Sequence, residues 1–451
     1  MQHSQPGVSF PPQQDEAVAV VGLGKIGLPL AIQYIQHGRK VIGCDINARV
    51  VEAINAGQCH VHEEPGLENL VASAVAQGRL SATTDTAAAV RQAGVIVVIV
   101  PVMVNQAHEV DFRSMDAATQ AVGAGLTAGT LVIYETTLPT GTTAGRLRQI
   151  LEEQSGLKAG HDFHLAYSPE RVSSGHIFRD LATYPKVVGG VNDASRDAGR
   201  NFYRSVLDAE IICMANTDEA EFVKLIETTY RDVNIALANE FAHYADAHHL
   251  DVMSAIAAAN TQPYSHIHAP GVGVGGHCIP VYPYFLLHGA SDGLDLPRQS
   301  RRINDAMADY AIERIEAEIG SLAGHAVLIL GVAYRGNVRE IAFTSAKLLQ
   351  QVLLEHEARV FAEDPLFSEE ELTALGYQPL RPEQRGEIRA IIVQADHQAY
   401  HSLDFSQFPN CRVVLDGRKA LRPEAITAAG MRYLSIGDGN KPPVAAHERV
   451  G

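Results

Sequence analysis

The sequence predicts an α/β protein with two doubly wound Rossmann-like domains joined by a long central helix. Two series of short apolar runs, one in each half of the chain, alternate with helical segments, which is typical of parallel sheets covered by helices. Between the two series, residues 217–250 contain neither glycine nor proline and predict one continuous helix. A length of 451 residues is enough for two or three domains.

Composition and charge exclude several classes of protein. With 46% hydrophobic and 20% charged residues, the chain is globular rather than disordered. The net charge of −16 argues against nucleic-acid binding, so an anionic ligand must be held by a local group of cations. The five cysteines have no CxxC spacing, which indicates a reducing compartment and no metal site.

The sequence also predicts a cytoplasmic protein without a membrane segment. Its first residues lack the basic start and apolar core of a signal peptide. The longest apolar run, residues 95–104, is interrupted by Pro101 and is about half as long as a membrane-spanning helix.

The first predicted element is a buried strand at residues 17–21 that leads into a glycine turn and a helix at residues 28–37. A second strand, residues 40–44, ends at Asp45. This order is the fingerprint of a dinucleotide site: glycines allow close approach of the pyrophosphate, and the acid binds the ribose hydroxyls. Because Asp45 would repel a 2′-phosphate, we expect NAD rather than NADP; the alternative is a glycine turn without a ligand. The turn residues expected to contact the cofactor are Gly22, Gly24, Lys25, Ile26 and Gly27.

Further strands are predicted at residues 95–100, 131–134 and 164–167, and each is followed by polar or turn-forming residues. The carboxyl ends of parallel strands face the ligand in such folds. Pro101, Thr137 and Glu170 are therefore candidates for the cofactor site, although each could be an ordinary turn or surface residue.

The predicted long helix carries Lys224, Thr228, Arg231 and either Asn234 or Ile235 on successive turns of one stripe. A lysine on an otherwise apolar stripe is either a functional residue or a surface lysine whose stem covers apolar atoms. We also expect this helix to form the surface of a homodimer.

Residues 271–285, GVGVGGHCIPVYPYF, place four glycines before Cys278. Glycines let the backbone approach a ligand closely, and loop amides or His277 could stabilise a reactive thiolate. The alternative is a tight glycine loop around an inert cysteine.

The alternation of strands and helices restarts in the second half of the chain. Strands are predicted at residues 326–330, 359–362 and 390–393, with residues 412–415 as the last strand and a helix at 345–356. This half lacks GxGxxG, so we expect it to bind a nucleotide through cations such as Arg335 and Arg418. The segment 298–311 adds further cations, among them Arg301.

Taken in order, these motifs resemble the UDP-glucose/GDP-mannose dehydrogenase family over nearly the whole chain. The most specific are VGLGKIGLPLA at residues 21–31, SPERV at 168–172, FVKL around Lys224, RDVNIALANE at 231–240 and GVGGHCIP around Cys278. SPER, in place of the form NPEF, is more similar to the branch that acts on UDP-N-acetylhexosamines.

The resemblance implies oxidation of the C6 alcohol of a nucleotide sugar to the acid by NAD. Cys278 would trap the intermediate aldehyde as a thiohemiacetal, and loss of hydride would give a thioester that water hydrolyses. Lys224 would stabilise the oxyanion, Glu170 would act as base toward water, and Thr137 would hold that water. By the same resemblance, the expected sugar-nucleotide contacts are Arg171, Lys224, Asn234, Gly275, Arg301, Arg335 and Arg418.

The chain departs from the family pattern at the chemistry itself. Thr228 replaces an asparagine and Tyr282 replaces an aspartate, and the family's FKPNxDDxRESP is YRGNVREIAFTS at residues 334–345. Two alternatives to full oxidation follow: an oxidoreductase that stops at the carbonyl, or an inactive protein that still binds nucleotide sugars. A simple 3-hydroxyacid dehydrogenase would explain neither the cysteine loop nor the second α/β half.

The predicted domain order has five parts. They are a flexible arm at 1–15, an NAD-binding Rossmann domain at 16–215, a central helical domain at 216–312, a nucleotide-sugar-binding α/β domain at 313–437 and a flexible tail at 438–451.

Overall fold

The computed structural model of the chain describes residues 17–105, 107–173, 175–290 and 293–439. The predicted arm at 1–15, and the predicted tail apart from residues 438–439, lie outside these residues. The chain divides into two compact units. The first unit contains the residues up to Glu227 together with Tyr284–His288, and the second contains Thr228–Pro283 and the residues from Gly289 onward.

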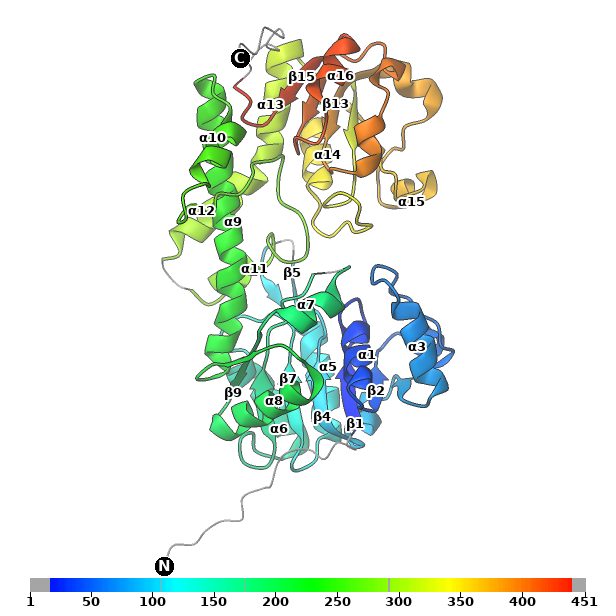
Figure 1. Cartoon of the computed structure of the whole chain (residues 1–451), viewed down its shortest axis with the longest axis vertical. Coiled ribbons are helices and arrows are strands. Elements are labelled where there is room, and N and C mark those ends of the chain that lie inside the picture. The colour runs from blue at the N-terminus through cyan, green and yellow to red at the C-terminus, as the bar shows by residue number, and fades with distance from the viewer. Residues whose placement is uncertain (1–16, 106, 174, 291–292, 440–451) are drawn as a thin grey trace, which may run out of the picture. The chain divides into compact units, whose positions relative to one another are not determined.

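The first unit is built on an eight-stranded sheet in the order β10-β9-β8-β7-β4-β1-β2-β3 (Figure 1). Its pairs are parallel except for β8 with β9. The central strands β1, β4 and β7 are rich in Val and Ile and buried on both faces, as expected for a sheet covered by helices. The bounds are β1 Ala17–Val21, β2 Val41–Cys44, β3 Leu80–Thr83, β4 Ala93–Val98, β7 Leu131–Tyr134, β8 His164–Tyr167, β9 Lys186–Gly190 and β10 Ile211–Cys213.

The helices of this unit begin where short polar side chains can cap their free N–H groups. Asn47, Asp85 and Asn192 accept hydrogen bonds at the first turns of α2, α4 and α8. The helices are α1 Gly27–Gln36, α2 Ala48–Asn55, α3 Leu67–Ala76, α4 Thr86–Val90, α5 Arg113–Gly125, α6 Arg148–Ser155, α7 Ile177–Thr183 and α8 Asp193–Val206, with a π-helical turn at Thr143–Leu147 and a hairpin of β5 Met103–Val104 and β6 Val110–Asp111.

The predicted long helix is present as α9, Thr217–Ala247, and contributes residues to both units. It ends three residues earlier than expected. His249 adopts a left-handed φ of 58°, and the N–H of Leu250 turns back to the carbonyl of Ala245 at 2.8 Å, which closes the helix.

The second unit contains a parallel five-stranded sheet in the order β12-β11-β13-β14-β15 (Figure 1). The prediction that residues 412–415 form the last strand was wrong, because β15 follows at Arg432–Ser435. Its sequence RYLS has little apolar character since it is an edge strand. The other strands are β11 Ala326–Leu330, β12 Arg359–Glu363, β13 Ile388–Val393 and β14 Val413–Asp416.

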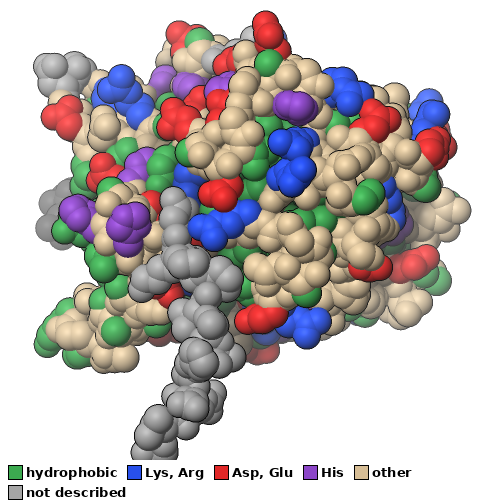
Figure 2. All heavy atoms as spheres, turned by 90° about the horizontal axis from the view of Figure 1, so that it is seen from above, with side chains coloured by type: hydrophobic (Ala, Val, Ile, Leu, Met, Phe, Trp, Pro, Cys, Tyr) green, Lys and Arg blue, Asp and Glu red, His purple; other side chains and the backbone are tan. Residues whose placement is uncertain are grey.

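Helices pack against this sheet through a core that includes Met307, Ile312, Leu349 and Leu353. Acidic and basic side chains are interspersed on the face shown in Figure 2. None of the helices that the structure describes has the length and apolar character of a membrane span. The remaining helices are α10 Val252–Ala259, α11 Tyr282–Leu287, α12 Asp295–Asp305, α13 Met307–Ile319, α14 Ser345–Glu355, α15 Glu369–Ala374 and α16 Pro423–Ala428, with 3-10 turns at Pro382–Glu387, Gln398–Ser402 and Phe405–Gln407.

Candidate functional site

Glycine is present for a different structural reason at each of the three positions in the turn after β1. Gly22 has a φ of 97° and lies against the backbone of Ile99. A Cβ at Gly27 would lie 1.8 Å from the Gly22 carbonyl oxygen, so glycine there lets α1 begin against the turn. A Cβ at Gly24 would meet no atom of the described chain within 4 Å. Packing therefore explains Gly22 and Gly27 but not Gly24, as expected for a glycine whose surface faces a ligand.

Asp45 joins the second strand to this turn. Its Oδ2 accepts a hydrogen bond from the Leu23 N–H at 3.0 Å, and its Oδ1 accepts one from Asn47 at 2.9 Å. The side chain is half-buried, so the carboxylate also borders solvent. The arrangement leaves it able to accept a hydrogen bond from a ribose hydroxyl.

The side chains of Lys25 and Ile26 have different surroundings in the turn. The Lys25 ammonium pairs with Glu63 at 2.7 Å, whereas Ile26 packs against the apolar core of the first unit. His60 also reaches the turn, with its Nε2 2.9 Å from the Leu23 carbonyl oxygen. The segment around residues 60–63 thus holds the turn from outside, which the sequence pattern did not indicate.

The residues predicted after β4, β7 and β8 share one edge of the sheet. Val98 pairs with Tyr134, and Tyr134 pairs with Tyr167, so the three strands end level with one another. Pro101, Thr137 and Glu170 follow these ends. Pro101 is exposed, Thr137 is buried and the Glu170 side chain is 10% exposed.

Glu170 belongs to a buried cluster with Glu135 and Lys186. The Lys186 Nζ lies 2.7 Å from an oxygen of each carboxylate. Burial raises the pKa of Glu135 in spite of the adjacent ammonium. Burial alone would also raise the pKa of Glu170, but the Lys186 charge and hydrogen bond outweigh it and hold this pKa below its usual range. Glu170 is thus ionised in the folded protein, at the edge of the sheet where β4, β7 and β8 end.

Lys224 lies on α9, and Arg171 contacts the same helix. Lys224 is 8% exposed. The Arg171 guanidinium donates to the Pro185 carbonyl at 3.0 Å and pairs with Glu227 of α9 at 2.5 Å. The Glu221 carboxylate accepts hydrogen bonds from the N–H groups of Gly141 and Thr143, so the first turns of α9 are tied to the loop after β7.

The cysteine loop belongs to the second unit. Cys278 is half-buried, and its carbonyl accepts hydrogen bonds from Val281 and Tyr282, where α11 begins. His277 is exposed, and its Nε2 lies 3.3 Å from Glu340. Glu340 is one of the residues at which segment 334–345 departs from the family pattern.

Four glycines of the loop are explained by contact with this chain itself. A Cβ at Gly271 would lie 2.8 Å from the Arg418 guanidinium, and one at Gly273 would lie 2.9 Å from the Ser345 hydroxyl. A Cβ at Gly275 would lie 2.8 Å from Tyr334, and Gly276, with a φ of 103°, donates its N–H to Ala342. The glycine run lets the loop lie directly against segment 334–345.

The predicted cations of the second unit have dissimilar surroundings. Arg301 is 3% exposed and pairs with Asp232 at 2.6 Å and with Asp305. Arg418 donates to the carbonyls of Gln394 at 2.7 Å and Gly273 at 3.2 Å, and so fastens the cysteine loop to the sheet. Arg335 is exposed. Buried Arg301 and half-buried Arg418 therefore have structural partners, and exposed Arg335 lies 5.6 Å from the centroid of the Tyr334 ring.

Asn234 and Thr228 lie on the part of α9 that belongs to the second unit. Asn234 exchanges hydrogen bonds with the backbone of His266 and His268, at 2.7 and 2.8 Å, and Thr228 is 3% exposed. The six predicted catalytic residues are thus divided between the units. The first unit holds Thr137, Glu170 and Lys224, and the second holds Thr228, Cys278 and Tyr282.

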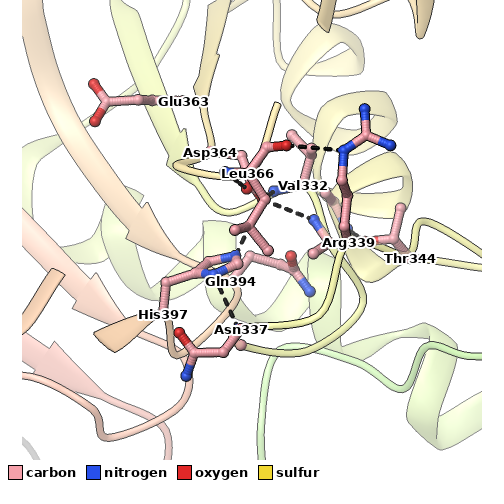
Figure 3. Close-up of polar contacts among 12 residues, drawn as sticks. Val332, Asn337, Arg339, Thr344, Glu363, Asp364, Leu366, Gln394 and His397 are labelled. Atoms are coloured by element: carbon pink, nitrogen blue, oxygen red, sulfur yellow. Dashed lines mark hydrogen bonds and ion pairs between the residues drawn. The ribbon is translucent and has the colours of Figure 1, made fainter. Parts of the chain in front are cut away.

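The turn after β11 is held by an acid in the same way as the turn after β1 (Figure 3). The Asp364 Oδ2 accepts hydrogen bonds from the N–H groups of Val332 and Ala333, at 2.8 and 3.0 Å, and lies 3.1 Å from the His397 Nε2. The Nδ1 of His397 accepts from Asn337 at 3.0 Å, so Nε2 carries the proton in the neutral ring. Burial opposes ionisation, but these hydrogen bonds hold the pKa of Asp364 below its usual value. Asp364 is 3% exposed, so its carboxylate is committed to the fold, unlike that of Asp45.

Comparison with known proteins shows that three domains of one family, the UDP-glucose/GDP-mannose dehydrogenase family, match successive parts of the chain. Its NAD binding domain matches residues 16–207, its central domain matches 218–306 and its UDP binding domain matches 328–423. The chain is 33% identical over 430 residues to a UDP-N-acetyl-D-mannosamine dehydrogenase of Pyrococcus horikoshii, covering 94% of this chain and 99% of that relative. It is 32% identical over 421 residues to an NDP-N-acetyl-D-galactosaminuronic acid dehydrogenase of Ralstonia nicotianae, covering 91% and 97%.

A solved structure gives the same result. The UDP-D-ManNAc dehydrogenase of Pyrococcus horikoshii superposes with a TM-score of 0.85 at 32% identity, over 94% of this chain and 100% of that one. The matched NAD binding domain and the glycine turn with its open Gly24 assign NAD as the cofactor. The chain belongs to the UDP-glucose/GDP-mannose dehydrogenase family.

Proposed function

We propose that this protein oxidises the C6 alcohol of a UDP-N-acetylhexosamine to the carboxylic acid, with reduction of two NAD+. The observation that carries the proposal is the ionised Glu170 at the edge of an NAD-binding sheet, in a chain that also presents Cys278 on a loop fixed to the nucleotide-binding half. The relatives named UDP-N-acetyl-D-mannosamine dehydrogenase and NDP-N-acetyl-D-galactosaminuronic acid dehydrogenase favour an N-acetylated sugar.

The proposed chemistry assigns roles to four residues of this chain. When bound, NAD+ would supply the hydride acceptor for both oxidations, and the hydroxyl proton of the alcohol would pass to water in the first one. The Cys278 thiolate adds to the aldehyde carbon, and Lys224 stabilises the resulting oxyanion. Loss of hydride leaves a thioester. Glu170 then takes a proton from a water held by Thr137 as the water oxygen attacks, and the C–S bond breaks with release of the thiolate.

The residues that the sequence suggested as substrate contacts have different proposed roles. Arg335 is exposed and can contact a diphosphate directly, and Arg301 and Arg418 would act through the partners that hold them. Arg171, Asn234 and Gly275 have contacts within their own units, so we propose that they shape the site rather than bind phosphate.

A homodimer through α9 is part of this proposal. Large apolar side chains are exposed at helical spacing along α9, which supports a self-complementary stripe. They are Phe222, Ile226, Tyr230, Leu237, Phe241 and Tyr244, each between 41% and 61% exposed. A cytoplasmic location is also proposed, because all five cysteines are free thiols.

The test is a stoichiometry measurement on the purified protein with NAD+ and a panel of UDP-, dTDP- and GDP-sugars. Full oxidation gives two NADH per sugar and a product that has gained one oxygen and lost two hydrogens. Cys278→Ala should abolish formation of the acid. A panel that produces no NADH contradicts the proposal.

The replacements Thr228 and Tyr282 favour a second candidate, a reaction that stops after one hydride transfer. That reaction gives one NADH and a product that has lost two hydrogens without gaining oxygen. Thr228→Asn and Tyr282→Asp together would then restore acid formation. If the wild-type protein binds the sugars without turnover, and this double variant is also inactive, the protein is a binding homologue.

A further inference from the structure

Lys186, to which the sequence patterns assigned no role, lies at the centre of the buried cluster in the first unit. It is the first residue of β9, and its side chain is 5% exposed. Its Nζ lies 2.7 Å from the Glu135 Oε2 and 2.7 Å from the Glu170 Oε2. A buried ammonium needs compensating charge, and here one lysine is shared by two carboxylates.

The second oxygen of each carboxylate is held as well. The Glu135 Oε1 accepts from the hydroxyls of Tyr34 in α1 and Tyr203 in α8, at 3.0 and 2.7 Å. The Glu170 Oε1 accepts from the N–H groups of Arg171 and Val172, at 2.6 and 3.1 Å. Rotation of either carboxylate would break charged or buried hydrogen bonds, so the Glu170 plane is fixed relative to the sheet edge.

The pKa values of the two carboxylates are shifted in opposite directions. Glu135 is fully buried, which raises its pKa, whereas the Lys186 charge, the Lys186 hydrogen bond and the Arg171 N–H outweigh burial and keep the pKa of Glu170 low. The nearby charges from other elements have partners of their own: Arg171 pairs with Glu227, and Asp180 of α7 pairs with Arg179. Tyr184, after α7, lines the small pocket beside Glu170.

We propose that Lys186, held in place by Glu135, is a positioning residue for Glu170. It keeps the Glu170 carboxylate ionised and oriented before water is activated, while Glu135 balances the charge of the ammonium. When Glu170 accepts the proton from water, the Lys186–Glu135 pair remains a neutral ion pair behind it. This inference rests on the proposed function in one respect, the assignment of Glu170 as the base that activates water.

The test compares substitutions that move the acid limb of the pH–rate profile in opposite directions. Lys186→Met removes the positive charge, so the acid limb of acid formation should move upward by about one pH unit or more, a loss of about tenfold on that limb. Glu135→Gln removes a negative charge from the far side of Lys186, so the limb should move to lower pH. Lys186→Arg should restore most of the wild-type profile.

A matched control is Lys158→Met, because Lys158 is a surface lysine of the same unit that pairs with Glu152 at 2.9 Å. It should keep the wild-type profile. NAD binding by calorimetry and circular dichroism report whether each variant folds. If Lys186→Met does not fold, the inference is tested by the direction in which Glu135→Gln moves the acid limb of the pH–rate profile.

A second readout does not depend on turnover. The carboxyl carbon of Glu170, observed by 13C NMR in Glu-labelled protein and assigned with Glu170→Gln, should titrate at higher pH in Lys186→Met and at lower pH in Glu135→Gln. Unchanged titration and an unchanged acid limb in both folded variants would overturn the inference. A different result would separate the two proposals. If the wild-type protein forms no acid, but the Glu170 titration still shifts in the two variants as expected, the proposed function is overturned and Lys186 remains the group that sets the ionisation of Glu170.

Discussion

The carboxylate of Glu221 in α9 accepts a hydrogen bond from the N–H of Thr143 at 2.8 Å. Its other oxygen accepts from Gly141 at 2.6 Å, and the side chain is fully buried. Burial raises the pKa of Glu221 from 4.5 to about 7, although both hydrogen bonds favour the ionised form. The loop that follows Thr137 is therefore tied to the Lys224 helix through a group that titrates near neutral pH.

This titration predicts a pH-dependent stability with a definite sign. Between pH 4.5 and about 7, Glu221 is protonated in the folded state and ionised in the unfolded state. The folded state then binds more protons, so the free energy of unfolding falls as the pH rises through this window and is constant with respect to Glu221 above it. The total fall attributable to Glu221 is about 3 kcal/mol.

The measurement is urea denaturation at a series of pH values for the wild-type protein and Glu221→Gln. The stability difference between them should decline from pH 5 to pH 8, because glutamine does not titrate. Glu219→Gln, an exposed position on the same helix, is the control and should follow the wild type. A difference that does not vary with pH would contradict the prediction.

Gly24→Ala should weaken NAD binding without lowering stability. The added Cβ meets no atom of the described chain within 4 Å, yet it occupies the side of the turn where the pyrophosphate is expected. We expect NAD affinity, measured by calorimetry, to fall at least about tenfold, which corresponds to about 1.4 kcal/mol. The melting temperature of the cofactor-free protein should stay unchanged. Gly386→Ala, which also meets no atom, should change neither quantity.

Gly275→Ala should have the opposite effect. Its Cβ would lie 2.8 Å from the Tyr334 Cβ and 3.0 Å from the Phe343 carbonyl oxygen, so the cysteine loop must move away from segment 334–345. We expect a destabilisation of about 1–3 kcal/mol in thermal or chemical denaturation. NAD affinity should be retained. Unaltered stability would show that the loop can shift freely, and the packing explanation for this glycine would then be wrong.

Phe241→Asp with Tyr244→Asp should convert a dimer into a monomer. Both side chains are exposed on the apolar stripe of α9, and a charge at each would be buried without a partner in a symmetric interface. Light scattering after size-exclusion chromatography measures the mass. Leu354→Asp, at an exposed apolar residue of α14, serves as the control and should leave the mass unchanged. A wild-type protein that is monomeric would contradict the proposed dimer.

Local patterns were sufficient for most of the fold. Strands such as Ala17–Val21 and Ala326–Leu330 are continuous apolar runs, and glycines or acids mark their ends, so strand positions and the parallel order follow from short segments. The α9 helix followed from an uninterrupted segment. Strands β3, β9 and β10 of the first unit were not predicted. The edge strand Arg432–Ser435 was also missed, because its stability comes from pairing with β14 and not from its own apolar character.

The glycine fingerprint, Asp45, Glu170 and Cys278 could be proposed as site residues from residue type and spacing together with the family resemblance. The surroundings of these residues could not. Lys186 is 16 positions from Glu170 and 51 from Glu135, and their contact exists only because β7, β8 and β9 are neighbours in one sheet. Arg301 and Arg418 belong to segments predicted to bind anions, yet Asp232 and the backbone of Gly273 and Gln394 are among their partners. Spacing records which groups a chain possesses, whereas the charge state and availability of each group depend on burial and on partners that folding brings from distant segments.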